Sequence, residues 1–233
     1  MLRSRWWRFV GVLTILALLG LPGQAASSLE ASDPRQARVI DGDSLQIDGT
    51  VIELFGIDAP ELGQLCYRGT KPWPCGLEAA YALHKLLALA QTPLRCTPVE
   101  GAADGSMVCE LGDQVLAEVL VRQGHAVALA DGVAEYREAE TAAKQARLGV
   151  WGGDFVMPAR WRAGERLARN GGETDRCNIK GVVRDGRRLY YVPLDPGYES
   201  LRLDLVRGDQ VFCSDEQARR LGWRREGEMA PSQ

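Results

Sequence analysis

The sequence predicts a mixed α+β protein, with a small β-barrel carrying helices and then a second, smaller α+β unit. Three observations support this class. Segments rich in Val, Ile and Leu alternate with segments of helical period over residues 37–148. Gly and Asp turns of the kind found in small barrels join them. A polar linker around residues 169–172 precedes a further hairpin pattern. A chain of 233 residues is long enough for one full core and a small second one.

The first elements are expected to form a hairpin. Residues 37–48 and 51–57 have strand composition, and Asp48-Gly49 between them is a strong two-residue turn signal. With that turn Asp43 pairs with Leu54, four residues before Asp58. Hairpin register alone therefore does not join Asp43 to Asp58, and barrel curvature or a bulge must do so.

Three helices and two more strands are expected next. Apolar residues recur at helical spacing over 77–90, and strands follow at about 93–98 and 106–111. Asp113 is expected to cap a second helix that runs through Arg122 and stops at Gly124. The third helix is expected over 133–148, closed by Gly149.

The C-terminal unit is expected over residues 173–226. It should contain a hairpin over 177–193 that turns at Asp185-Gly186, a short strand at Val211-Phe212 and a helix over 215–221. A unit of this size needs a staple to be stable, and a Cys177–Cys213 disulfide would supply one.

Residues 1–26 are expected to be a signal peptide. Three arginines precede an apolar run of about 13 residues, and small residues then mark a cleavage site near Ala25/Ala26. The run is shorter than the ~20 residues of a spanning helix, although an uncleaved anchor is the alternative. The sequence therefore predicts a periplasmic or secreted protein with no stable membrane span after cleavage.

Six cysteines follow the signal peptide, and an oxidising compartment favours disulfides. Fifteen pairings are open to six cysteines, and the nearest-neighbour set is the one expected. These pairs are Cys66–Cys75, Cys96–Cys109 and Cys177–Cys213. Zinc is the rival reading, but the chain has no Cys-x-x-Cys pair, and His84 and His125 lack ligand spacing. Both histidines are expected to be structural.

The charge balance disfavours nucleic acid as a partner. The net charge is −3, and it becomes −6 without the signal peptide and its three arginines. Residues 31–165 carry 12 basic and 19 acidic side chains. Nucleic-acid-binding proteins usually show a basic surface, so binding here would need a local basic groove.

Two short acidic motifs carry the strongest functional signal, Asp41-Gly42-Asp43-Ser44 and Asp58-Ala59-Pro60-Glu61. Taken alone, Asp-Gly-Asp is most often only a turn. It is not an EF-hand loop, because the twelfth position holds Ile52 in place of Glu. Calcium requires several oxygen ligands of mixed origin, and Asp43, Asp58 and Glu61 could supply some of them.

These motifs, together with the helix end at 120–124 and the Gly149-Val150-Trp151 tail, resemble the staphylococcal nuclease (thermonuclease) family over about residues 37–161. The segment from Cys177 resembles a small cysteine-bearing module of exported bacterial relatives. The resemblance implies a five-stranded OB-fold barrel with three helices over residues 33–165. It further implies a Ca²⁺ ion held by Asp43, Asp58 and the Ala59 backbone carbonyl, with Glu61 as the general base.

The same resemblance implies that two phosphate-binding arginines are replaced, by Glu53 and Ser106. One arginine on a phosphoryl transition state can be worth ~10³–10⁵ in rate. At ~6 Å and an effective dielectric of ~20, Glu53 would instead add repulsion of about 2–3 kcal/mol. We therefore expect a weak or inactive nuclease, a pseudoenzyme that binds or scaffolds an unknown protein or envelope partner.

Two alternatives stay open. The first is an active calcium-dependent phosphodiesterase on DNA or RNA that uses a relocated cation, with candidates Arg38, Arg68, Lys71 and Arg95. The second is a disulfide-rich envelope protein without a metal function.

Overall fold

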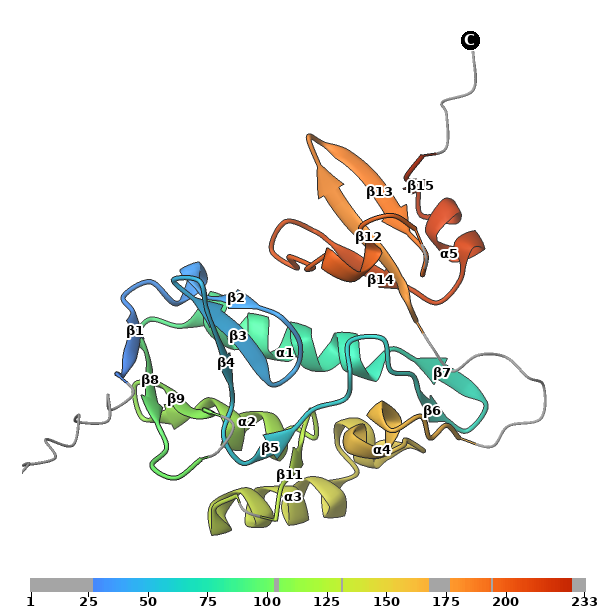
Figure 1. The fold of residues 1–233 in the computed structure, drawn as a ribbon. Coiled ribbons are helices and arrows are strands. Elements are labelled where there is room, and N and C mark those ends of the chain that lie inside the picture. The colour runs from blue at the N-terminus through green and yellow to red at the C-terminus, as the bar shows by residue number, and fades with distance from the viewer. Residues whose placement is uncertain (1–26, 103–104, 131, 168–176, 194, 228–233) are drawn as a thin grey trace, which may run out of the picture.

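The computed structural model describes residues 27–102, 105–130, 132–167, 177–193 and 195–227 (Figure 1). The expected signal peptide and the polar linker at 169–172 lie outside these residues. The described part contains both strands and helices along its whole length, which confirms the α+β class. Its helices are α1 (Cys75–Leu89), α2 (Leu116–Arg122), α3 (Ala134–Ala146), α4 (Pro158–Arg162) and α5 (Asp215–Arg220), with 3-10 turns η1 (Pro34–Gln36), η2 (Gly149–Gly152) and η3 (Tyr198–Ser200).

The strands of the described residues form five separate sheets. One sheet has the order β2 (Arg38–Val39), β3 (Ser44–Ile47), β4 (Thr50–Glu53), and a two-stranded sheet pairs β6 (Cys66–Arg68) with β7 (Lys71–Trp73). A four-stranded sheet has the order β1 (Leu29–Ala31), β8 (Leu94–Pro98), β9 (Met107–Leu111), β10 (Gln114–Val115). Strand β5 (Ile57–Asp58) pairs with β11 (Val127–Ala128). The C-terminal sheet has the order β14 (Gln210–Phe212), β12 (Ile179–Arg184), β13 (Arg187–Tyr191), β15 (Arg224–Arg225).

The first hairpin has the predicted turn and register. Strands β3 and β4 pair through Ile47 and Thr50, around Asp48 and Gly49. Both turn residues have positive φ, 48° and 84°, as the two-residue hairpin turn with matching twist requires. The Leu54 amide donates to the Asp43 carbonyl at 2.8 Å, so Asp43 does face Leu54 as the hairpin predicts.

The chain leaves this hairpin abruptly after Leu54, and this bend brings Asp58 back toward Asp43. Leu54 forms an isolated parallel bridge with Met107, which joins the β2–β3–β4 sheet to the four-stranded sheet. Gly56 follows with φ +76°, and a Cβ there would lie 2.9 Å from the Gly132 Cα, so only glycine suits this bend. The hydrogen bonds of the described strands do not close a barrel, and the five-stranded barrel remains a prediction.

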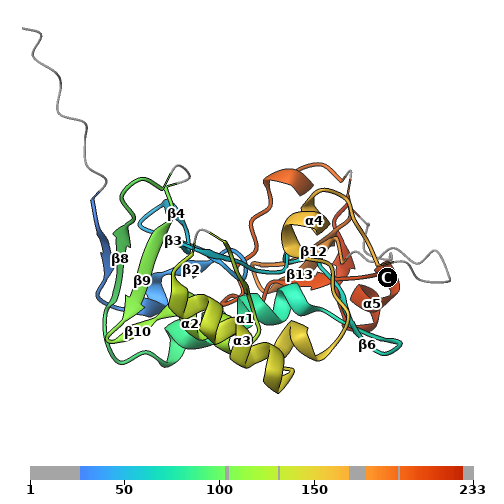
Figure 2. The same ribbon diagram turned by 90° about the horizontal axis from the view of Figure 1, so that it is seen from below.

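One hydrophobic core fills the space between these sheets and helices α1 and α2. Leu45 of β3, Leu83 of α1, Leu94 of β8 and Leu120 of α2 are all fully buried in it. Helix α2 packs against α3 on the side of α1 that faces away from the C-terminal sheet (Figures 1 and 2).

Two predicted helix boundaries are wrong. Asp113 does not cap the second helix, because β10 intervenes and α2 begins after Val115 without a side-chain cap. Helix α3 ends at a left-handed Arg147 (φ 53°) rather than at Gly149. The predicted stop at Gly124 is confirmed, since Gly124 has φ +74° and the His125 amide donates to the Leu120 carbonyl.

All three predicted disulfides are present. Cys66–Cys75 joins β6 to the start of α1, and Cys96–Cys109 links directly opposed residues of β8 and β9. Cys177–Cys213 connects the start of the C-terminal segment to the residue after β14. These bonds indicate folding in an oxidising compartment. In the part of the chain described, no helix has the length and apolar character needed to cross a bilayer.

The C-terminal segment packs on the first part of the chain. The Cys177 amide donates to the Gly63 carbonyl at 2.8 Å, and Arg38 donates to the Leu203 carbonyl at 3.2 Å. Leu65 and Tyr67 share a small apolar cluster with residues of the C-terminal sheet. The hairpin of this sheet turns at Asp185-Gly186, as predicted.

Candidate functional site

The predicted site residues converge on one pocket of about 900 Å³. It opens between the ends of β4 and β5, the loop before β9, and α4. Asp43, Glu53, Asp58, Glu61 and Ser106 all line it, although they come from segments up to 63 positions apart. Two further carboxylates, Asp41 and Glu100, also line the pocket, so it is strongly acidic.

The Asp41–Ser44 loop is built to present Asp43. Asp41 Oδ1 accepts from the Ser44 amide at 2.8 Å and from the Asp43 amide at 3.2 Å, which fixes a tight turn. Gly42 lets this loop pack closely against Ala59 and Ala79, because a Cβ at position 42 would lie 2.7 Å from the Cβ atoms of both residues.

Asp43 and the second motif are joined by a direct hydrogen bond. Asp43 Oδ2 accepts from the Ala59 amide at 2.5 Å. This bond uses the Ala59 N–H, whereas the predicted metal role concerned its carbonyl, and Ala59 itself does not line the pocket. Burial raises the pKa of Asp43 well above its ordinary value, and the nearby Asp41 and Glu53 carboxylates raise it further.

The main surprise is a cation inside the pocket. Arg162, the last residue of α4, donates from Nη1 to Asp58 Oδ1 and to Glu61 Oε1, both at 2.7 Å. Its Nη2 donates to Asp58 Oδ2 at 3.1 Å, so the guanidinium holds both Asp58 oxygens. The Asp58 side chain is 7% exposed and that of Arg162 is 50% exposed. The hydrogen bonds that Arg162 donates to Asp58 and Glu61 raise the pKa of its guanidinium, which therefore stays charged.

Two opposing effects act on the pKa of Glu61. Burial raises the pKa of Glu61, and the Arg162 guanidinium opposes this shift. The net direction is upward, and Asp41 and Asp58 contribute to it. A carboxyl with a raised pKa suits a general base better than an ordinary one, but here one of its oxygens is engaged by Arg162.

The four candidate replacement cations lie elsewhere. Arg38 donates to the Leu203 carbonyl, Arg95 pairs with Glu30 at 3.5 Å, and Arg68 lies over the Trp73 ring. Lys71 is at the tip of the β6–β7 hairpin. Of the residues that the structure describes, Arg162 is the one Lys or Arg side chain that lines the pocket. The sequence prediction of these four was wrong and missed Arg162.

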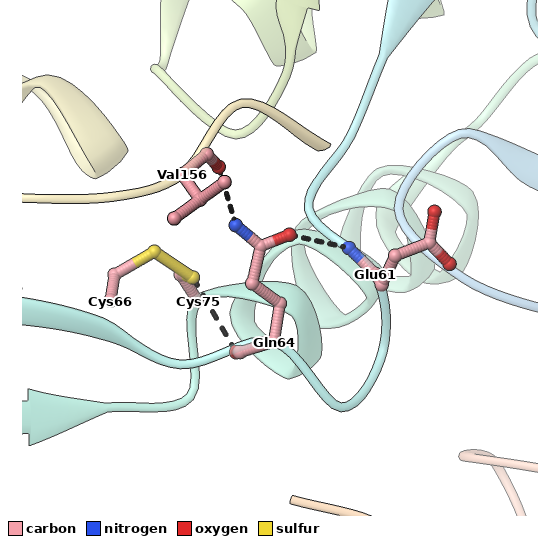
Figure 3. Close-up of a disulfide and its surroundings, with 5 residues drawn as sticks. All are labelled: Glu61, Gln64, Cys66, Cys75 and Val156. Atoms are coloured by element: carbon pink, nitrogen blue, oxygen red, sulfur yellow. Dashed lines mark hydrogen bonds between the residues drawn. A yellow bond between two sulfur atoms is a disulfide. The ribbon is translucent and has the colours of Figure 1, made fainter. Parts of the chain in front are cut away.

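A second residue that the sequence prediction missed is Gln64, whose side chain lies between Glu61 and Val156 (Figure 3). Its side chain is fully buried, with Oε1 accepting from the Glu61 amide at 3.2 Å and Nε2 donating to the Val156 carbonyl at 2.7 Å. Gln64 thus ties the Glu61 loop to the segment that leads into α4. The Cys66–Cys75 disulfide lies beside it, with the Cys75 sulfur 3.5 Å from the Gln64 carbonyl oxygen.

As arranged here, the residues do not fit a calcium ion. In the described ranges no group of three or more Asp, Glu, His or Cys side chains is placed to hold a metal. Calcium takes six to eight oxygen ligands, whereas Asp58 and Glu61 are bonded to Arg162 and Asp43 is bonded to Ala59. His84 and His125 do not line the pocket, and burial lowers the pKa of His125.

Part of the chain is similar to a known protein. No family model matches the chain. The succinoglycan biosynthesis protein ExoI of Rhizobium meliloti (strain 1021) is 36% identical to it over 122 residues. The match covers 50% of this chain and 63% of that protein, so the chain spans less than two thirds of this relative's length.

Proposed function

We propose that residues 33–165 form a staphylococcal nuclease-like OB-fold domain with weak or absent phosphodiesterase activity, acting as an exported binding or scaffold domain. The observation that carries this proposal is the pocket. It collects both acidic motifs, yet Glu53 and Ser106 line it where phosphate-binding arginines are expected, and its one described cation is already bonded to two carboxylates.

The charges that line the pocket support weak or absent phosphate binding. Among the described residues, six carboxylates and one guanidinium line the pocket, so a phosphodiester would approach a strongly negative surface. Each carboxylate at ~6 Å contributes repulsion of about 2–3 kcal/mol at an effective dielectric of ~20. Protonation of Asp43, whose pKa is raised, removes one of these charges and leaves most of the repulsion in place.

A second candidate function is an active calcium-dependent phosphodiesterase on DNA or RNA, and the position of Arg162 favours it. A guanidinium in the pocket is the relocated cation that such an enzyme needs, provided that it can leave the carboxylates and contact the phosphate. In this reading Arg162 substitutes for the arginines missing at Glu53 and Ser106.

A nuclease assay separates the two candidates. The purified, disulfide-bonded chain is incubated with heat-denatured DNA and with RNA, in CaCl₂ or in EDTA, beside Glu61→Ala. We expect wild type to digest neither substrate faster than Glu61→Ala. Calcium-dependent digestion that Glu61→Ala abolishes would contradict the proposal, and its loss in Arg162→Gln as well would establish the second candidate.

The partner is also a proposal. The three disulfides support an extracytoplasmic location, and the similar protein from Rhizobium meliloti is named for succinoglycan biosynthesis. We propose an envelope or exopolysaccharide-assembly protein as the partner. Co-purification from envelope extracts with Asp43→Ala as a comparison tests whether the pocket takes part.

A further inference from the structure

We infer that Arg162 is the resident cation of the acidic pocket: its guanidinium holds Asp58 and Glu61 together without a metal, and it competes with calcium for these two carboxylates. The inference rests on the proposed function only for the identity of the competing ion. The pairing itself is a property of the described residues.

The geometry matches that of a bridging cation. Three hydrogen bonds of 2.7, 2.7 and 3.1 Å join one guanidinium to both oxygens of Asp58 and to one of Glu61. Forked arginine–carboxylate bonds are among the strongest that proteins make. A divalent ion placed between the same carboxylates would both compete for their oxygens and repel the guanidinium.

The pairing is built into the fold and is not a chance surface contact. The segment before α4 is anchored at Asp154, whose amide donates to the Tyr67 carbonyl at 2.7 Å while the Tyr67 amide donates back at 2.9 Å. Two residues later, the Val156 carbonyl accepts from the buried side-chain Nε2 of Gln64 at 2.7 Å (Figure 3). Pro158 then begins α4, and one short helix carries the chain to Arg162.

Gln64 makes this anchoring specific to the site. The same buried side chain bonds the Glu61 amide and the Val156 carbonyl, so it sets the position of the acidic partner and of the segment carrying the basic one. Arg162 is therefore a positioning residue for Asp58 and Glu61, and Gln64 is a positioning residue for both sides of the ion pair.

Arg162 balances the charge of the buried Asp58 carboxylate. Asp58 is almost fully buried and lies in a pocket with five other carboxylates. A buried carboxylate without a counter-charge is costly. Arg162 supplies that charge within the chain, so the folded pocket does not depend on a supply of divalent ions.

Calcium affinity tests the inference directly, by isothermal titration calorimetry on the EDTA-treated, disulfide-bonded chain at pH 7. The variants are Arg162→Gln, Arg162→Lys and the control Arg160→Gln. Arg160 is on the same helix but pairs with Glu165 and does not line the pocket. Circular dichroism is used to check that each variant is folded.

We expect Arg162→Gln to bind calcium at least ~10-fold more tightly than wild type, because no hydrogen bond to Asp58 or Glu61 must break. Arg162→Lys should lie in between, since lysine keeps the charge but loses the fork, and Arg160→Gln should match wild type. A purely structural role for Arg162 would not produce this order.

Equal affinity in wild type and Arg162→Gln, or no calcium binding by either, overturns the inference. If Arg162→Gln does not fold, wild-type affinity in Arg162→Lys overturns it. Digestion of DNA by wild type would instead contradict the proposed function and leave the affinity comparison intact, so the two failures are distinguishable.

Discussion

Removing the guanidinium should destabilise the metal-free protein by an amount that the exposure of the pair sets. Breaking a fully buried ion pair by deleting one partner costs about 3–5 kcal/mol, and exposed pairs contribute about 0–1 kcal/mol. The pair here is intermediate, with Asp58 at 7% and Arg162 at 50% side-chain exposure. For Arg162→Gln in EDTA we expect a loss of about 1–3 kcal/mol in the free energy of unfolding.

For a chain of this size, 1 kcal/mol shifts the melting temperature by about 2–4 °C. Arg162→Gln should therefore melt roughly 2–12 °C below wild type by circular dichroism in oxidising buffer. Arg160→Gln is the matched control, because its pair with Glu165 is exposed on both sides at 66% and 42%, and it should stay within about 1 °C.

A double-mutant cycle isolates the pair from other effects. Asp58→Asn removes the buried charge that Arg162 compensates, so Asp58→Asn/Arg162→Gln should lose less stability than the two single variants added together. Strict additivity, or an Arg162→Gln variant as stable as Arg160→Gln, would refute the reasoning that Arg162 is the counter-ion of Asp58.

Three further predictions concern other parts of the structure. Burial raises the pKa of folded Asp43, so the folded state binds a proton more tightly than the unfolded state, and stability is lost as pH rises through the folded pKa. In EDTA, Asp43→Asn should therefore raise the free energy of unfolding at pH 7, measured by urea denaturation, and this gain should vanish near pH 4. A gain that grows toward low pH would contradict the upward shift of the Asp43 pKa. Gln64→Leu deletes two buried hydrogen bonds and leaves the Glu61 amide and the Val156 carbonyl unpaired, so it should lower the free energy of unfolding by about 1–3 kcal/mol. It should also speed amide hydrogen exchange in α4, and unchanged exchange there would show that Gln64 does not position Arg162. Cys177→Ser/Cys213→Ser should lower stability by about 2–4 kcal/mol and expose residues 177–227 to limited proteolysis first, and cleavage that begins elsewhere would contradict the role of this bond as the staple.

Local signals in the sequence predicted the local structure well. The Asp48-Gly49 turn determines the register of β3 and β4, and this register correctly placed Asp43 opposite Leu54. The spacing of the cysteines favoured the three disulfides that form, because each links segments that are close in the chain or lie side by side in one unit.

Long-range features could not be predicted in the same way. Arg162 lies 104 positions from Asp58 and 101 from Glu61, and no periodicity or motif connects them. Gln64 resembles an ordinary loop glutamine in the sequence, and only its complete burial reveals its role. The four candidate cations all lie nearer than Arg162 to the acidic motifs in the sequence, whereas the fold brings α4 to the pocket. The Asp113 cap failed because a two-residue strand intervenes, and such short strands carry too little pattern to detect.

The most direct test of the central claim is the initial rate of single-stranded DNA cleavage in CaCl₂ by wild type and by Glu53→Arg/Ser106→Arg/Arg162→Gln. This triple variant restores both phosphate-binding positions and releases Asp58 and Glu61. We predict that wild type cleaves no faster than Glu61→Ala and that the triple variant cleaves at least ~10³-fold faster, since one positioned arginine can supply that factor. A folded, calcium-binding triple variant with no gain, or a wild type that already cleaves well above Glu61→Ala, would contradict the account.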